Sequence, residues 1–139
     1  MIRSSDNDSA TMLWDAVGGA AGMRAGNSRL GFTGTVSDPN DFWGLTITTV
    51  QDQLGLLKAL TSSTWPLTHR SRAYVADLLS QVEADQVWGV SEAADAGTTP
   101  VLKNGWLPVD SDDDLWAINS IGRAEHGGDY YLVAVLSSS

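Results

Sequence analysis

The sequence comprises 139 residues, of which 42% are hydrophobic and six are Trp, a content of core-forming side chains that excludes a disordered chain and fits one folded domain. Its formal net charge of -9, with only eight Lys and Arg residues, argues against nucleic acid and membranes as partners, because phosphate backbones and anionic lipids attract cationic surfaces. The absence of cysteine excludes disulfides and thiolate metal sites.

Residues 1–10 are polar, without the apolar stretch of a signal peptide, and no later apolar run is long enough to span a bilayer. The sequence as written therefore predicts a cytoplasmic protein.

Two helices are predicted in the first quarter of the chain. The first covers residues 9–17, has an apolar side, and ends at Gly18 and Gly19, which can adopt the left-handed conformation that stops a helix. A second short helix follows to Ala25. Residues 27–45 are rich in Gly, Thr, Ser, Asp and Pro and predict a long surface loop of the kind that often frames a site.

Two further helices are predicted in the middle of the chain. One begins at Thr48 or Thr49, which can cap its free amides, while Asp52 complements the positive end of the helix. The other covers residues 68–82 after the break at Pro66. The buried face of the first of these helices is predicted to be Val50, Leu54, Leu57 and Leu60.

From about residue 100 the sequence predicts strands, at residues 101–106, 115–125 and 130–136. Gly127 and Gly128 permit the positive φ of a tight hairpin, so the last two segments should pair antiparallel. The prediction is an α+β fold in a single partial domain, with an antiparallel sheet of about three strands flanked by helices, a helical region at 1–85 and a strand region at 86–139.

Two tripeptides point to chemistry. Ser5, Asp6 and Asn7 spell S-D-N before a helix, and K-N-G stands on a predicted strand at residues 103–105. In this order, with the intervening helices and the hairpin, the chain resembles the C-terminal part of the serine hydrolases of the class A β-lactamase and penicillin-binding-protein (D,D-peptidase) superfamily, whose second and third signatures are S-D-N and K-[ST]-G.

The resemblance implies a role for each matching residue. The Ser5 hydroxyl would relay a proton to the leaving nitrogen, and Lys103 would favour that transfer and attract the carboxylate of a penicillin or D-alanyl peptide. Asp6 would fix the loop, and the Asn7 amide would bind the acyl side chain of the substrate.

The K-N-G strand would form the other wall of the site. Gly105 would allow close approach of the substrate, and the backbone N–H of Trp106 would be one of two oxyanion-hole donors. Asn104 replaces the hydroxyl residue of the family pattern and would contact the substrate carboxylate with a different geometry. Trp43 and Trp106 are candidate site walls.

Two parts of the catalytic apparatus are missing from the sequence. No S-x-x-K occurs, because Lys58 and Lys103, the only lysines, follow Gly55 and Pro100 at the required spacing. No Glu precedes residue 83 to activate a deacylating water, although Asp38 or Asp41 could stand in. The chain is therefore expected to be inactive alone, and a whole protein of this kind to be a slow acylating hydrolase.

Simpler interpretations remain open. Residues 5–7 could be only a helix cap and Lys103 a solvated strand residue. His69 and His126 are predicted surface residues without a role, and the Asp110, Asp112 and Asp114 series lacks the glycine and glutamate of a calcium loop. No metal or cofactor is expected.

Three functional hypotheses follow. The first is a C-terminal fragment of a β-lactamase-like serine hydrolase acting on β-lactam or D-alanyl peptide amide bonds, whose full-length relatives would be secreted or bound to the cell envelope. The second is a non-catalytic binding module for β-lactam or peptidoglycan-type ligands, and the third an unrelated acidic interaction domain. Relatives cover the last strand, so residues 130–136 should be an open apolar edge through which the chain could self-associate.

Overall fold

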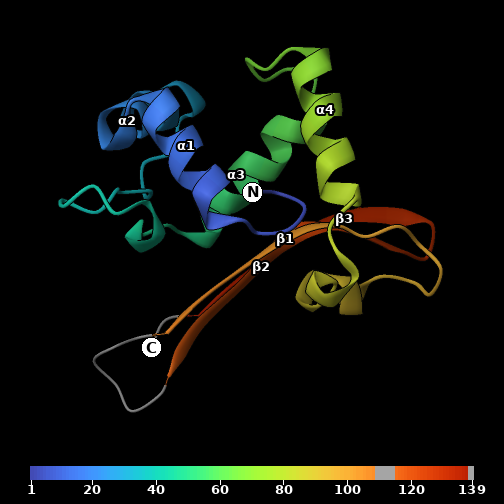
Figure 1. Cartoon of the computed structure of the whole chain (residues 1–139). Helices are drawn as coiled ribbons and strands as arrows, with labels where there is room; N and C mark the ends of the chain where they lie inside the picture. The colour runs from blue at the N-terminus through green and yellow to red at the C-terminus, as the bar shows by residue number, and fades with distance from the viewer. Residues whose placement is uncertain (109–114, 138–139) are drawn as a thin grey trace.

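The computed structural model describes residues 1–108 and 115–137, which form an α+β fold. Four α-helices lie over one face of an antiparallel sheet, as Figure 1 shows, and a short irregular segment lies under the other face. The predicted Asp110, Asp112 and Asp114 turn lies outside the described residues. No helix in the described ranges combines the length and apolar character needed to cross a membrane.

The first two helices agree with the predicted order but not with every boundary. α1 spans Asn7–Val17, and Gly18, with φ of 93°, ends it. α2 spans Gly19–Leu30 instead of ending at Ala25. It runs on because Gly31 supplies the left-handed stop and donates to the carbonyl oxygens of its last turn, so the predicted surface loop begins only at residue 31.

α3 (Val50–Thr61) begins after Thr49, whose side chain accepts a hydrogen bond from the Asp52 amide as predicted. Leu57 is buried, and Leu54 and Leu60 are half-buried. Val50 is 43% exposed, contrary to prediction, at the first residue of the helix, one turn before the packed residues Leu54 and Leu57. α4 (His69–Ser80) is capped by Thr68 and ends two residues before the predicted boundary.

The sheet has the order β1-β2-β3. The strands are β1 (Val101–Pro108), β2 (Trp116–His126) and β3 (Asp129–Leu136), and both neighbouring pairs are antiparallel. Gly127 and Gly128 form the two-residue turn between β2 and β3, with φ of 63° and 84°, which is the conformation that the predicted hairpin requires.

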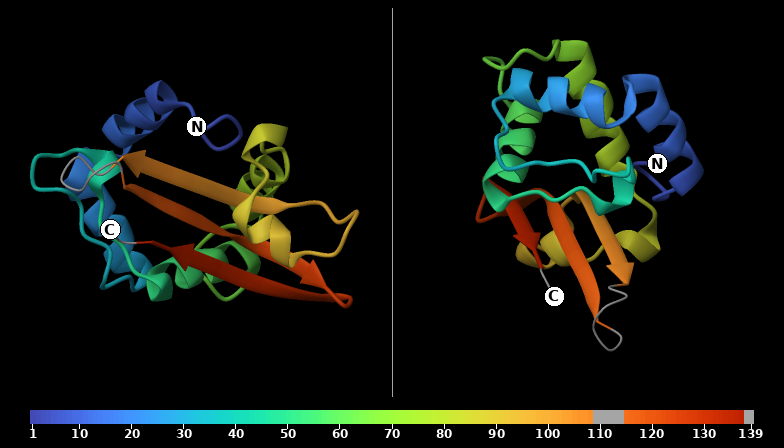
Figure 2. Two further views of the ribbon diagram at one scale, coloured as in Figure 1. Left: turned by 90° about the horizontal axis from the view of Figure 1, so that it is seen from below. Right: turned by 90° about the vertical axis from the view of Figure 1, so that its left-hand side faces the viewer.

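The two faces of the sheet have different neighbours (Figure 2). α3 packs against β3 and β2, and α4 against β1. On the opposite face, Val90 of the 3₁₀ helix η3 (Gly89–Ala93) packs with Leu102 and Ala124 in the buried core. Because alternate strand residues point to opposite faces, Leu102 and Asn104 face η3, whereas Lys103 between them faces the helices.

Candidate active-site cleft

Ser5 and Lys103 meet at the boundary between the helices and the sheet, although 98 positions separate them. The Lys103 ammonium lies 2.6 Å from the Ser5 hydroxyl oxygen and donates to it. Ser5 occupies the left-handed region with φ of 54°, an uncommon conformation for a residue with a side chain. The turn that precedes α1 thus holds the hydroxyl in a conformation that costs backbone strain.

Asp6 fixes this turn by capping α1. Its carboxylate accepts a 2.7 Å hydrogen bond from the Ser9 amide. Hydrogen bonding from the Ser9 side chain, and secondly from this amide, lowers the pKa of Asp6. Ser5 is therefore held immediately before a capped helix, and Asn7, the first residue of that helix, lies on the wall of the same cleft.

Lys103 reaches the cleft from β1 with its ammonium partly buried. Burial lowers the pKa of Lys103, since removal from water disfavours the charged form. The ammonium also donates to the backbone carbonyl of Asn104 and lies 6.0 Å from the centre of the Trp106 ring. Lys103 is thus a fixed group in a cleft and not the solvated strand residue of the simpler interpretation.

The Asn104 side chain does not face the cleft, contrary to the prediction that it contacts the substrate carboxylate. It is only 3% exposed, and its amide nitrogen donates to the carbonyl oxygens of Gln86, at 2.8 Å, and Trp88, at 3.1 Å. These bonds use both of its N–H groups, so the side chain ties β1 to the preceding segment and has no donor left for a ligand. The backbone of Asn104 still borders the cleft.

The cleft has a volume of about 530 Å³. Trp43 and Trp106 lie on its wall together with Ser5, Asn7 and Lys103. The Trp43 indole nitrogen donates to the Thr11 hydroxyl at 3.1 Å, and the Trp106 ring packs against Trp88 with 6.0 Å between centroids. At Gly105 no atom of another described residue lies within 4 Å of the position that a Cβ would occupy.

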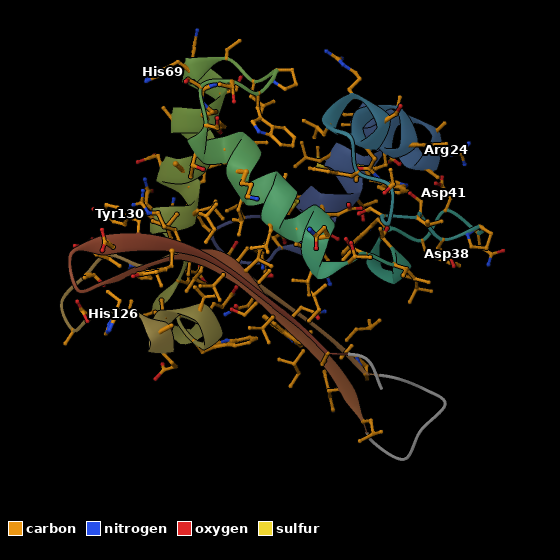
Figure 3. The ribbon with its side chains drawn as sticks, turned by 180° about the vertical axis from the view of Figure 1, so that it is seen from behind. Arg24, Asp38, Asp41, His69, His126 and Tyr130 are labelled. Carbon is orange, nitrogen blue, oxygen red and sulfur yellow. The ribbon has the colours of Figure 1, made fainter. Side chains whose placement is uncertain are left out.

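The two aspartates considered as substitutes for a catalytic glutamate lie outside this cleft. The Asp41 carboxylate accepts a 2.8 Å hydrogen bond from the Ala20 amide at the start of α2, and the Asp38 carboxylate accepts one from the Asn40 amide. Figure 3 shows both on one loop, far from the end of the sheet that carries His126. Neither borders the cleft, so the geometry gives no support to a water-activating role for Asp38 or Asp41.

Some features of the site were not predicted from the sequence. The Thr11 hydroxyl accepts a hydrogen bond from Trp43. The spacing of four residues between Asn7 and Thr11 could have indicated that both lie on the same face of the helix. Leu107 and Asn119 also border the cleft through the pairing of β1 with β2. No signal in the sequence identified Asn119, because its position depends on the register of strands distant in sequence.

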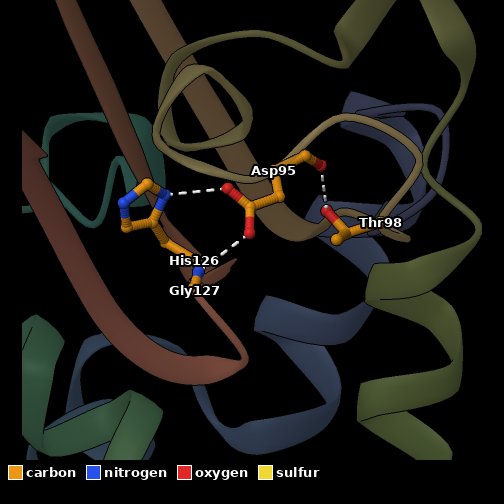
Figure 4. A network of polar contacts seen from close by, with 4 residues as sticks. All are labelled: Asp95, Thr98, His126 and Gly127. Atoms are coloured by element: carbon orange, nitrogen blue, oxygen red, sulfur yellow. Dashed lines mark hydrogen bonds and ion pairs between the residues drawn. The ribbon is translucent and has the colours of Figure 1, made fainter.

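A polar cluster at the far end of the sheet was also missed. The Asp95 carboxylate lies 2.8 Å from His126 Nδ1 and accepts a 2.8 Å hydrogen bond from the Gly127 amide (Figure 4). The hydrogen bond from Gly127 is the main cause of the lowered pKa of Asp95. His126 is thus an exposed residue, as predicted, that joins a loop to the β2–β3 hairpin. Within the described ranges, no three His, Asp or Glu residues are grouped to hold a metal ion.

The described residues, with four α-helices and a three-stranded antiparallel sheet, form a partial β-lactamase-like fold. The chain superposes on a crystal structure of a variant of the extended-spectrum β-lactamase TLA-1 with a TM-score of 0.75 and 22% sequence identity. The match covers 96% of this chain and 51% of the TLA-1 chain, so this chain spans about half the length of that protein. No protein-family model and no curated protein sequence matches the chain.

Proposed function

We propose that this chain supplies the proton-relay and ligand-binding part of a β-lactamase-like serine hydrolase site that acts on β-lactam or D-alanyl peptide amide bonds. The main support is the 2.6 Å approach of the Lys103 ammonium to the Ser5 hydroxyl in an open cleft. A helix cap alone needs no lysine at that position.

The hydrogen-bond directions suit a proton relay. Because Lys103 donates to the Ser5 oxygen, the hydroxyl proton of Ser5 remains available to a leaving nitrogen in the cleft. The lowered pKa of Lys103 favours return of a proton to Ser5, since a catalytic group works best when its pKa approaches the working pH. The same ammonium would attract the carboxylate that penicillins and D-alanyl peptides share.

The free edge of β1 suits an oxyanion donor. In an antiparallel strand, residues two apart direct their N–H and C=O groups to the same edge. The Asn104 carbonyl accepts from Lys103 on the side of the cleft, so the Trp106 N–H belongs on that side too. This N–H is the proposed donor to the oxyanion, and the Trp106 ring is 46% exposed on the wall of the cleft.

The nucleophile would come from a segment that this sequence does not contain, because the sequence has no S-x-x-K. We therefore expect no covalent adduct when the chain is incubated with benzylpenicillin and measured by intact-protein mass spectrometry. An adduct on Ser5 would contradict the relay role and make this residue the nucleophile.

A second candidate is a binding module, supported by a cleft that combines a fixed ammonium with the absence of that nucleophile. Both candidates require ligand binding, which calorimetry with benzylpenicillin would test. We expect Lys103→Ala to weaken binding at least tenfold, consistent with loss of a charged hydrogen bond. Lys58→Ala, which removes an exposed lysine of α3, is the control. Equal affinities of the two variants would refute the proposed site.

The coding DNA upstream of Met1 would distinguish the two candidates. An in-frame S-x-x-K would support the hydrolase. A stop codon directly before Met1 would leave the binding module.

A further inference from the structure

We infer that Trp106 is a positioning residue whose ring stabilises Lys103 as an ammonium group directed at Ser5. The inference rests on the proposed function of the cleft, to which it adds a residue that acts through Lys103. It gives the ring a role separate from that of the Trp106 backbone N–H.

The Lys103 ammonium lies within the distance at which an aromatic ring attracts a cation. Its nitrogen is 6.0 Å from the centre of the Trp106 ring, and indole is the aromatic group that attracts cations most strongly. Residues 103 and 106 point to opposite faces of β1, so their side chains meet at the outer edge of this strand in the described sheet, which borders the cleft. The Trp106 ring and the Ser5 hydroxyl thus face the same ammonium.

Trp88 holds the Trp106 ring in place. The two ring centroids are 6.0 Å apart and the ring planes are tilted by 54°, within the range of favourable aromatic pairs. The carbonyl oxygen of Trp88 accepts a 3.1 Å hydrogen bond from Asn104, so the backing ring is itself tied to β1. A ring that is already ordered interacts with Lys103 at little cost in conformational entropy.

Two effects act on the charge of Lys103 in opposite directions. Burial lowers the pKa of Lys103, because removal from water disfavours the ammonium form. The π face of the Trp106 ring favours the ammonium form and therefore raises the same pKa. Only the ammonium form can donate to the Ser5 oxygen, since a neutral amine in that place would accept the hydroxyl proton instead. The ring thus keeps Lys103 in the form that the proposed relay needs.

Neighbouring charges do not offset the burial of Lys103. The ionisable groups around it stand in the segment before α1, on α4 and the residues after it, and on β2: the Met1 amine, Arg3, Asp6, Asp77, Glu83 and Arg123. The other ionisable residues of α4 belong to its first turn with His69, at the end far from the sheet (Figure 3). Burial is the one cause of the lowered pKa of Lys103, so none of these groups counteracts it. Trp106 is therefore the neighbour to which we assign that role.

The two lysines of the chain make a direct test possible. Lysine labelled with ¹³C at Cε gives one NMR signal from Lys103 and one from the exposed Lys58 of α3, and Lys58→Ala assigns them. Titration of these signals measures the pKa of each lysine without any ligand. We expect Trp106→Leu to lower the pKa of Lys103 by about 0.5 and to leave that of Lys58 unchanged, as loss of a cation–π interaction predicts.

The direction of the change separates this role from a structural one. A ring that only shields Lys103 from water would, when shortened, admit water and raise the pKa of Lys103. Trp106→Phe keeps an aromatic face and should restore most of the wild-type pKa. A rise or no change in Trp106→Leu, or a pKa in Trp106→Phe as low as in Trp106→Leu, would overturn the inference.

Trp116→Leu is the matched control. Trp116 on β2 is 50% exposed, against 46% for Trp106, and is not among the described residues that border the cleft. Its replacement should leave the pKa of Lys103 unchanged, and an equal fall in both variants would overturn the inference. Trp106 is half exposed, so its variants should fold, as circular dichroism would verify. Trp106→Met is a second non-aromatic variant and should agree with Trp106→Leu.

Calorimetry with benzylpenicillin separates this inference from the proposed function. Affinity should fall as the pH rises through the pKa of Lys103, and should fall at a lower pH in Trp106→Leu than in the wild type. No saturable binding by a wild-type protein whose Lys103 titration responds to Trp106 would overturn the proposed function and leave the ring–ammonium interaction standing. Retained binding with the same Lys103 titration in wild type and Trp106→Leu would overturn the inference alone.

Discussion

At the scale of single residues, Asn104 connects the edge strand of the site to the segment behind it. The hydrogen bonds from its side-chain amide to the carbonyl oxygens of Gln86, which is buried, and Trp88, which is partly buried, hold β1 in the position from which Lys103 reaches Ser5. Its Oδ1 atom is buried without a partner among the described residues, a cost that the two donated bonds offset. We interpret Asn104 as a positioning residue of the site.

Replacement of Asn104 should therefore affect stability. We expect Asn104→Ala to lower the free energy of unfolding by about 1–3 kcal/mol, because the carbonyl oxygens of Gln86 and Trp88 lose their donor. Asn104→Asp should cost more, since an ionised carboxylate cannot donate to those oxygens. Urea denaturation followed by tryptophan fluorescence would measure both. A stability of Asn104→Ala equal to that of the wild type would contradict this assignment.

Gly89 provides a second test at this scale, with a control in the same chain. Its φ is 75°, and a Cβ would lie 2.4 Å from the Ser120 hydroxyl, which accepts from the Val90 amide. Gly97 also has a positive φ, of 86°, but among the described residues no neighbouring atom lies within 4 Å of its Cβ position. Gly97→Ala thus measures backbone strain alone, whereas Gly89→Ala adds a steric clash in the core.

We expect Gly89→Ala to be more destabilising than Gly97→Ala by about 1–3 kcal/mol, the usual cost of overpacking. Thermal and urea unfolding of the two variants would give the difference. Similar losses in both variants would mean that Ser120 moves aside and that the close approach is not required.

At the scale of elements, the sequence predicted which segments are helices or strands better than it predicted where each one ends. The caps at Thr49 and Thr68 and the Gly127–Gly128 turn are local chemistry, so the adjacent residues sufficed to identify them. The extension of α2 to Leu30 was missed because residues 27–30 were assigned to the polar loop that follows the helix. The exposure of Val50 depends on packing between helices, which periodicity along one helix does not contain.

The Asp95 cluster joins two elements, and its stabilising effect should depend on pH. The folded-state pKa of Asp95 is lowered, mainly by the Gly127 amide and also by His126, so the folded protein binds fewer protons than the unfolded chain in acid. Stability from this group is therefore present above the ordinary aspartate pKa and is lost as the pH falls through the lowered value. The pH window is therefore acidic and begins near the ordinary aspartate pKa.

We expect Asp95→Asn to unfold more readily than the wild type near neutral pH and to converge with it in acid. Thermal unfolding from neutral to acidic pH would show the difference, and Asp8→Asn, at an exposed aspartate of α1, is the control. A constant gap between Asp95→Asn and the wild type at every pH would show that charge is not the cause.

At the scale of the whole molecule, the meeting of Ser5 and Lys103 is the feature that no local pattern could supply. The two residues are 98 positions apart, and only resemblance to a family with S-D-N and K-[ST]-G signatures linked them before the fold was known. The same resemblance misplaced Asn104. An amide at a position where the family has a hydroxyl is long enough to reach the segment behind the strand, and tertiary packing, not the motif, decides its direction.

The last strand, β3, is of interest because this chain matches only 51% of the TLA-1 chain. β3 is an edge of the described sheet, and Tyr131 and Val135 on it are 51% and 57% exposed. An apolar strand with one unpaired edge is a template for strand pairing. We propose that two copies of this chain pair through residues 130–136, which would extend the sheet across a twofold axis.

Sedimentation velocity over a range of concentrations would test this pairing. We expect a concentration-dependent dimer for the wild type and a monomer for Val135→Lys, because a pairing strand would have to bury the added charge. Val17→Lys makes the same substitution at a 53% exposed position on α1, far from the β3 edge in sequence, and should still dimerise. A monomeric wild type, or equal dimerisation of both variants, would rule out the β3 edge as the contact.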